Sequence, residues 1–225
     1  MDEIMHFPMH GRGEPHQPIR VLSDLWRNAL VAAPASLAIA DRSAALTYRD
    51  LVGSATALAD TLRRRGVAGR AVAMLLPNGA DFHVAFLGCL LAGAVPAPIN
   101  AAYPAPQVRP LLQLAAPRVV LAPPPIDPAL AALAAEHPDL ELIAFERPAP
   151  GAVPEPDAFP APGLADPAVM LFTGGSTGIP KAVVHSHGAM ATAVRAVEYC
   201  WPTRARGEVW LPIAPMSHIY GFLTG

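Results

Sequence analysis

Short apolar runs alternate with helical stretches through the middle of the chain, and this alternation constrains the fold more than any other feature. We expect four strands, at 70–76, 94–99, 118–122 and 140–145. Helical stretches separate them at 79–92, at about 106–116, and from Pro128 with Asp127 as the N-cap. Strands joined by helices of about ten residues require right-handed crossovers, which pair the strands in parallel. The sequence therefore predicts an α/β fold on a mainly parallel sheet.

The segment from Thr47 to Gly66 carries the clearest helix pattern. Thr47 is followed three residues later by Asp50, which is the spacing of a capping box. The apolar face of this helix consists of Leu51, Ala55, Leu58 and Leu62. Arginines 63–65 then meet the negative end of the helix, and Gly66 is expected to close it.

In the segments near the two ends of the chain, helix caps and prolines predict where elements begin and end. A first helix, with Ser23 as its N-cap, is expected to end before Pro34. Six prolines in 146–166 predict a loop, because proline lacks the N–H that helices and central strands need. Further expected elements are strands at 168–172, at 182–185 and near 208–213, a helix from a Ser186 cap to about Tyr199, and a helix start at Ser217.

The two ends of the chain differ in composition from its middle. Residues 1–20 are acidic and then rich in His, Pro and Gly, so we expect a flexible leader before one α/β region over 21–225. The chain closes on an apolar stretch in the middle of an expected element. Natural ends are usually polar and frayed, so this pattern indicates a fragment.

Bulk composition excludes several classes of protein. The formal net charge is -2 and arginines are scattered, which does not indicate a nucleic-acid binder. Cys89 and Cys200 stand far apart, outside any zinc-type spacing, so a disulfide framework or zinc site is not expected. A reducing cytoplasm fits best. The longest apolar stretches are broken by Gly and Pro and are too short to span a membrane.

The stretch LFTGGSTGIPKAVVHSH, residues 171–187, joins two apolar runs through residues that are nearly all glycine, hydroxyl or proline. Glycines 174, 175 and 178 let the backbone approach a ligand closely and turn its N–H groups toward an anion. Hydroxyls of Thr173, Ser176 and Thr177 add donors. Lys181 adds a compact positive charge, and it is the one lysine beside fifteen arginines. This pattern predicts a polyphosphate-binding loop.

Two better-known phosphate loops do not fit this spacing. A P-loop places Gly and Lys side by side before Ser or Thr, whereas Gly178 and Lys181 are separated by Ile179 and Pro180, and Ala182 follows. The three glycines also lack the spacing of a dinucleotide fingerprint. An ordinary mobile hairpin connection stays open as the alternative.

The same stretch closely resembles the phosphate loop of the adenylate-forming enzymes, which include acyl-CoA synthetases, aryl-acid ligases, nonribosomal peptide adenylation domains and luciferases. The stretches ALTYRDL, LLAGAVPAPINAAYPA and LPIAPMSHIYGF are similar to other segments of that family. Together they extend over about residues 20–225 in the expected order. The resemblance implies the early α/β part of the N-terminal domain of such an enzyme, without its C-terminal domain.

The resemblance also implies a reaction. A carboxylic acid attacks the α-phosphate of ATP, with Mg²⁺ offsetting charge, and coenzyme A or a carrier pantetheine then takes the acyl group. The phosphate-binding residues would be Thr173, Gly174, Gly175, Ser176, Thr177, Gly178 and Lys181. His218 matches the family histidine beside the acyl pocket, which Tyr220 and Gly221 would help to shape.

Departures from the family pattern leave alternatives open. Gly174 replaces a usual serine, Ala182 replaces a usual glycine, and no second lysine is available for adenylation. A truncated, non-catalytic binding or scaffolding module of the same fold is therefore the second hypothesis. A metal site that uses His185 and His187 is not expected, because these side chains would point in different directions. An acyl carrier protein is a possible partner.

Overall fold

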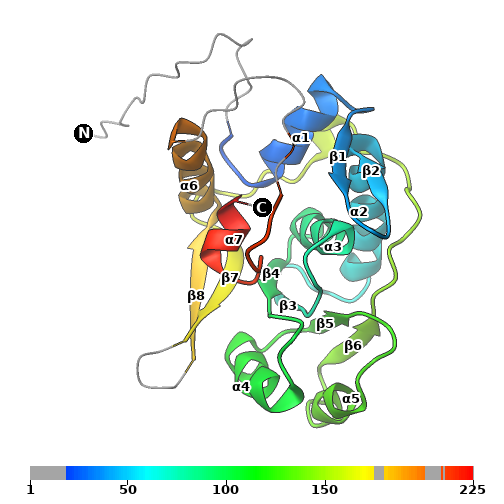
Figure 1. Ribbon diagram of the computed structural model, residues 1–225, viewed down its shortest axis with the longest axis vertical. Helices are drawn as coiled ribbons and strands as arrows, with labels where there is room; N and C mark the ends of the chain where they lie inside the picture. The colour runs from blue at the N-terminus through cyan, green and yellow to red at the C-terminus, as the bar shows by residue number, and fades with distance from the viewer. Residues whose placement is uncertain (1–18, 175–179, 201–208, 210, 225) are drawn as a thin grey trace.

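Four parallel strands form the central sheet of the structure, a computed structural model that describes residues 19–174, 180–200, 209 and 211–224 (Figure 1). The strand order is β4-β3-β5-β6, and every neighbouring pair is parallel. These strands are β3 (Ala71–Met74), β4 (Val95–Pro98), β5 (Val119–Ala122) and β6 (Glu141–Ala144). The predicted α/β fold with a mainly parallel sheet is confirmed.

Helices and two antiparallel strand pairs surround this sheet. The pairs are β1 (Leu37–Ala40) with β2 (Ala45–Thr47), and β7 (Pro167–Thr173) with β8 (Lys181–Ser186). The helices are α1 (Ser23–Ala32), α2 (Tyr48–Arg63), α3 (Ala80–Leu91), α4 (Ala105–Ala115), α5 (Pro128–Ala135), α6 (His187–Cys200) and α7 (Ile219–Thr224). The expected loop 146–166 contains one short 3₁₀ turn, Pro156–Ala158.

Strands β3, β4 and β5 are buried on both faces of the sheet, which explains their continuous apolar runs, whereas the edge strand β6 is only partly buried. In β3, Val72 and Met74 pack into the core formed with α2 and α3, whereas Ala73 belongs to the core formed with α4 and α5. Strand β7 lies beside β4 and divides its residues in the same way. Its Leu171 joins the first core and its Phe172 joins the second. The hairpin that carries the glycine loop is therefore anchored in both cores.

Helix α2 begins and ends as its sequence predicts. The Thr47 side chain accepts from the Asp50 N–H, and the Asp50 carboxylate accepts from the Thr47 N–H, which completes the capping box. Gly66 has a φ of 66°, a left-handed conformation that favours glycine, and its N–H donates to the Arg63 carbonyl. The apolar face of this helix is buried as expected.

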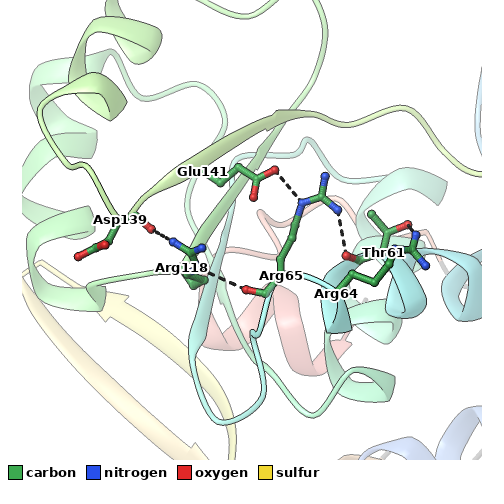
Figure 2. Close-up of polar contacts among 6 residues, drawn as sticks. All are labelled: Thr61, Arg64, Arg65, Arg118, Asp139 and Glu141. Atoms are coloured by element: carbon green, nitrogen blue, oxygen red, sulfur yellow. Dashed lines mark hydrogen bonds and ion pairs between the residues drawn. The ribbon is translucent and has the colours of Figure 1, made fainter.

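Arginine side chains tie the amino ends of the parallel strands to the end of α2 (Figure 2). Arg65 Nε donates to Glu141 Oε1 at 2.7 Å, and Arg65 Nη1 donates to the Thr61 carbonyl at 2.9 Å. Arg118 donates to the Arg65 carbonyl through Nε and to the Asp139 carbonyl through Nη1. Because β5 and β6 begin here, these bonds hold the end of the sheet opposite to the carboxyl ends of its strands.

Two local predictions are wrong. Ser23 is the first residue of α1 and does not cap it, because its hydroxyl donates to the Pro160 carbonyl. The neighbouring Asp24 fixes the chain just before α1, because its carboxylate accepts hydrogen bonds from the N–H groups of Arg20 and Val21. The strand expected near 208–213 is absent at 209 and 211–213, and its other positions lie outside the described residues.

The described helices include none that combines the length and the apolar composition needed to cross a membrane.

Candidate active site

Thr173 and Lys181 form the last pair in the register of β7 and β8. Residues directly opposite each other on antiparallel strands share a face, so a hydroxyl and an ammonium group lie on one side of the hairpin at the base of the glycine loop. Both residues are exposed. The Lys181 side chain makes no hydrogen bond or ion pair with any residue in the described part of the chain. Its charge is therefore available to a ligand.

The base of this hairpin is held by packing. The pair next to Thr173 and Lys181 is Phe172 with Ala182, and both pack against the core under α4. Among the described residues, an added Cβ at Gly174 would meet no atom within 4 Å apart from its chain neighbours. The predicted phosphate ligands Gly175, Ser176, Thr177 and Gly178 lie outside the described residues.

His218 lies just before helix α7 and is exposed. Its N–H donates to the Pro215 carbonyl at 3.1 Å, and its carbonyl accepts from the Phe222 N–H at 2.8 Å. Gly221 is needed for this turn, because a Cβ there would stand 2.3 Å from the Pro215 carbonyl oxygen. Gly221 therefore contributes to this region first by leaving room for the Pro215 carbonyl, which any side chain at 221 would meet. Tyr220 is two-thirds exposed.

The segment that carries His218 is docked on α3 by apolar contacts. Met216 is buried and belongs to the core formed with α2 and α3. The ring of Phe222 packs edge to face on the ring of Phe86, with centroids 4.9 Å apart. Exposed His218 lies between these two anchors, so the anchors fix its backbone on both sides. Among the described residues, no hydrogen bond or ion pair joins His218 to Thr173 or Lys181.

Asn78 is a polar contact of this segment that the sequence analysis did not identify. Its Nδ2 donates to the Ala214 carbonyl at 2.8 Å, and its Oδ1 accepts from the Met216 N–H at 3.0 Å. Asn78 follows β3 at the carboxyl end of the sheet, where binding residues of parallel sheets gather. The asparagine after the apolar run 70–76 was the signal in the sequence that could have indicated it.

The turn that carries Asn78 is fixed by an aspartate from the β1–β2 hairpin. Asp41 accepts from the Ala80 N–H at 2.8 Å, at the start of α3. Burial raises the pKa of Asp41, but hydrogen bonds from Ala80, Ser43 and Ala44 outweigh it and bring the pKa to about 2. The carboxylate therefore stays charged and holds this turn at any physiological pH.

Two further histidines, His185 and His187, lie at the end of β8 and the start of α6. His187 is buried at the start of α6, and its Nδ1 accepts from the Leu22 N–H at 3.3 Å. His185 is half-buried on β8. Within the described ranges, no group of three or more His, Cys, Asp or Glu side chains has an arrangement that could hold a metal ion.

Comparison with known proteins agrees with this architecture. Residues 26–225 match the family of AMP-binding enzymes. The long-chain-fatty-acid–CoA ligase FadD13 of Mycobacterium tuberculosis is 31% identical over 188 residues, which cover 80% of this chain and 37% of the ligase. An isonitrile lipopeptide synthase of Streptomyces coeruleorubidus is 34% identical over 179 residues, 77% of this chain and 12% of the synthase.

Solved structures show the same fold. The inhibitor-bound N-terminal domain of FACL13 from Mycobacterium tuberculosis has a TM-score of 0.79 and 28% identity, with 91% of this chain and 54% of that chain covered. ATP-bound MatB from Rhodopseudomonas palustris has a TM-score of 0.75, and the match covers 90% of this chain and 42% of MatB. Because the identity is 24%, this likeness supports the fold alone. The present chain spans little more than a third of FadD13. The resemblance noted in the sequence is confirmed, and the chain belongs to the AMP-binding enzyme family of adenylate-forming ligases.

Proposed function

We propose that this chain supplies the phosphate-binding hairpin and part of the acid-binding site of an AMP-forming acid–thiol ligase. A carboxylate oxygen of the acid forms a bond to the α-phosphorus of ATP, and the bond from that phosphorus to the bridging oxygen breaks, which releases pyrophosphate. A thiol then attacks the acyl carbon, and AMP leaves. Residues 21–225 would form part of the N-terminal domain of this ligase, after a leader over residues 1–20.

The observation that carries this proposal is the pairing of Thr173 with Lys181. A hydroxyl and an ammonium group that has no partner among the described residues share one face at the base of a glycine-rich loop, and the strands below them are anchored in two cores. Charge-assisted hydrogen bonds to a phosphate contribute about 1.5–3 kcal/mol each. A rigid base gives these donors a fixed position, and the glycines give the loop room to close on the triphosphate.

Each residue of the predicted site has a role in this scheme. Lys181 offsets the charge that develops on the departing pyrophosphate. The backbone and hydroxyl donors of the loop, Thr173, Gly174, Gly175, Ser176, Thr177 and Gly178, hold the β and γ phosphates. His218 lines the site of the acid. Mg²⁺ would enter on the phosphates of ATP, because the described residues offer no acidic cluster to hold it.

The acceptor is either coenzyme A or the pantetheine of a carrier protein. FadD13 is named as a CoA ligase, and another relative, CymA of Salinispora arenicola, is named as a probable non-canonical nonribosomal peptide synthetase. The two acceptors share a thiol on the same flexible arm, so either suits the proposed chemistry. An enzyme that uses ATP and one of these thiols would act in the cytoplasm.

Acid-dependent exchange of pyrophosphate into ATP tests the proposal directly. The complete gene product is assayed against fatty, aryl and amino acids in the presence of Mg²⁺. We expect exchange that requires one class of acid and stops without it. No exchange with any acid, from a folded protein, would reject the ligase and favour a non-catalytic module. ATP hydrolysis that needs no acid would indicate a hydrolase instead.

A further inference from the structure

We propose that Asn78 is a positioning residue for His218. Its side-chain amide fixes the backbone of residues 214–216 and thereby sets where the imidazole of His218 stands at the acid site. The functional meaning of this role rests on the proposed function, in which His218 lines that site. The geometric part of the inference depends only on the contacts of Asn78.

The Asn78 amide makes a two-point attachment to the backbone. Nδ2 donates to the Ala214 carbonyl at 2.8 Å, and Oδ1 accepts from the Met216 N–H at 3.0 Å. A single hydrogen bond would leave the segment free to rotate about it. Two bonds to residues that are two apart fix both its distance from the sheet and its direction. No other described side chain hydrogen-bonds to these two backbone groups.

Asn78 can do this because its own backbone is held in place. Gly79 has a φ of 146°, and a Cβ there would stand 2.6 Å from Asp41 Oδ2. That oxygen accepts from the Ala80 N–H at 2.8 Å. The β1–β2 hairpin thus fixes the turn after β3, and this turn presents the amide. Contacts therefore run from Asp41 to the turn that carries Asn78, from Asn78 to residues 214–216, and from there to His218.

The attachment reaches His218 through one short turn. Met216 is buried, and the His218 N–H donates to the carbonyl of Pro215, the residue between the two that Asn78 binds. Phe222 holds the other side through Phe86. The apolar anchors resist separation of the segment from α3, but they do not direct its hydrogen-bonding groups. Asn78 therefore supplies the orientation that the apolar anchors lack.

Hydrogen exchange of residues 214–218 tests the attachment without any need for activity. In N78A the Met216 amide should exchange about tenfold faster or more, because its acceptor, Asn78 Oδ1, is lost. In N78D the carboxylate repels the Ala214 carbonyl at neutral pH, so protection should also fall. Near pH 4 a protonated carboxyl can donate to Ala214 and accept from Met216, so protection relative to the native chain at that pH should recover in part.

The matched control is N100A. Asn100 follows β4 at the same end of the sheet, and its Oδ1 accepts from the nearby Ala102 N–H at 2.9 Å. N100A should leave exchange at 214–218 unchanged. The imidazole resonances of His218 should move in N78A and stay in place in N100A. Unchanged exchange and unchanged His218 resonances in N78A would overturn the inference, whereas a loss confined to 214–218 with an unchanged melting temperature supports it.

A double-variant comparison tests the functional part. In the complete gene product N78A should raise the KM for the acid about tenfold, with a smaller effect on kcat, and should add little in an H218A background. Equal effects in both backgrounds would mean that Asn78 does not act through His218. Absence of exchange in the native protein would reject the proposed ligase and leave the hydrogen-exchange and resonance results to decide the geometric claim.

Discussion

Leu22 and His187 lie 165 residues apart in the chain, and the Leu22 N–H donates to Nδ1 of the buried His187 imidazole at 3.3 Å. This bond joins the segment before α1 to the start of α6, the helix that follows the glycine hairpin. A neutral imidazole can accept at Nδ1, but a protonated one carries hydrogen on both nitrogens and cannot. The link between these two segments therefore depends on the charge of one histidine.

Acid should weaken the fold through this histidine. Burial lowers the pKa of His187 below 6.5, and the charges of Asp166 and Asp24 oppose this only in part. Burial also lowers the pKa of His83 to about 4. The folded chain binds these protons less readily than the unfolded chain does. The free energy of unfolding should therefore be highest above pH 6.5 and fall as the pH drops from 6.5 toward 4.

Urea unfolding at several pH values measures this effect. H187Q should have a shallower fall in unfolding free energy between pH 7 and pH 5 than the native chain, since it removes one of the two groups. H185Q, a change two residues away on β8, should keep the native slope. Identical slopes in H187Q and in the native chain would show that His187 does not control the acid response.

The contact between α2 and α3 leaves no room for a side chain at Gly88. An added Cβ would stand 2.6 Å from Leu58 Cδ2 and 3.1 Å from Leu58 Cβ, inside the buried core. G88A should lower the unfolding free energy by about 1–3 kcal/mol, as overpacked cores do. The double variant G88A/L58A should lose less than the sum of the two single variants, because the smaller residue 58 relieves the clash. Additive losses would contradict the close approach of the two helices.

Gly221 should be equally intolerant of a side chain, for a reason local to the turn at His218. A Cβ there would meet the carbonyl oxygens of Pro215 at 2.3 Å and Ala214 at 2.8 Å, and backbone atoms cannot swing aside. G221A should therefore release α7 and speed hydrogen exchange over 214–224 about tenfold or more, by the loss of several contacts. G174A, whose added Cβ meets nothing within 4 Å, is the matched control and should not change exchange there. Native-like exchange in G221A would refute the turn at His218.

The parallel sheet could be predicted because its information is local. Each strand is a short apolar run, Gly93 follows α3, the Asp127 side chain caps α5, and strands β3, β4 and β5 are buried throughout. The capping box of α2 is likewise contained within four residues. The β1–β2 hairpin escaped notice because its residues are only half-buried or exposed and make no continuous apolar run.

The arrangement of the site could be predicted only in part. The sequence identified the strands on either side of the glycine loop and placed Lys181 at the start of the second strand, as the structure has it. The place of Asn78 after the run 70–76 could have marked the residue, but not its partners Ala214 and Met216, which lie 136 and 138 residues away. Local pattern carries no information on such pairs. The prediction that Ser23 caps α1 failed for a related reason, because its hydroxyl donates to the distant Pro160 carbonyl.

The central claim is that the β7–β8 hairpin holds the phosphates of ATP through Lys181, and the most direct measurement is acid-dependent ATP–pyrophosphate exchange by K181A in the complete gene product. R195A is the matched control, since it removes an exposed positive charge whose guanidinium donates only to Thr192 among the described residues. We predict that K181A lowers the exchange rate about tenfold or more, while R195A stays near the native rate. Exchange at the native rate in K181A would contradict the account.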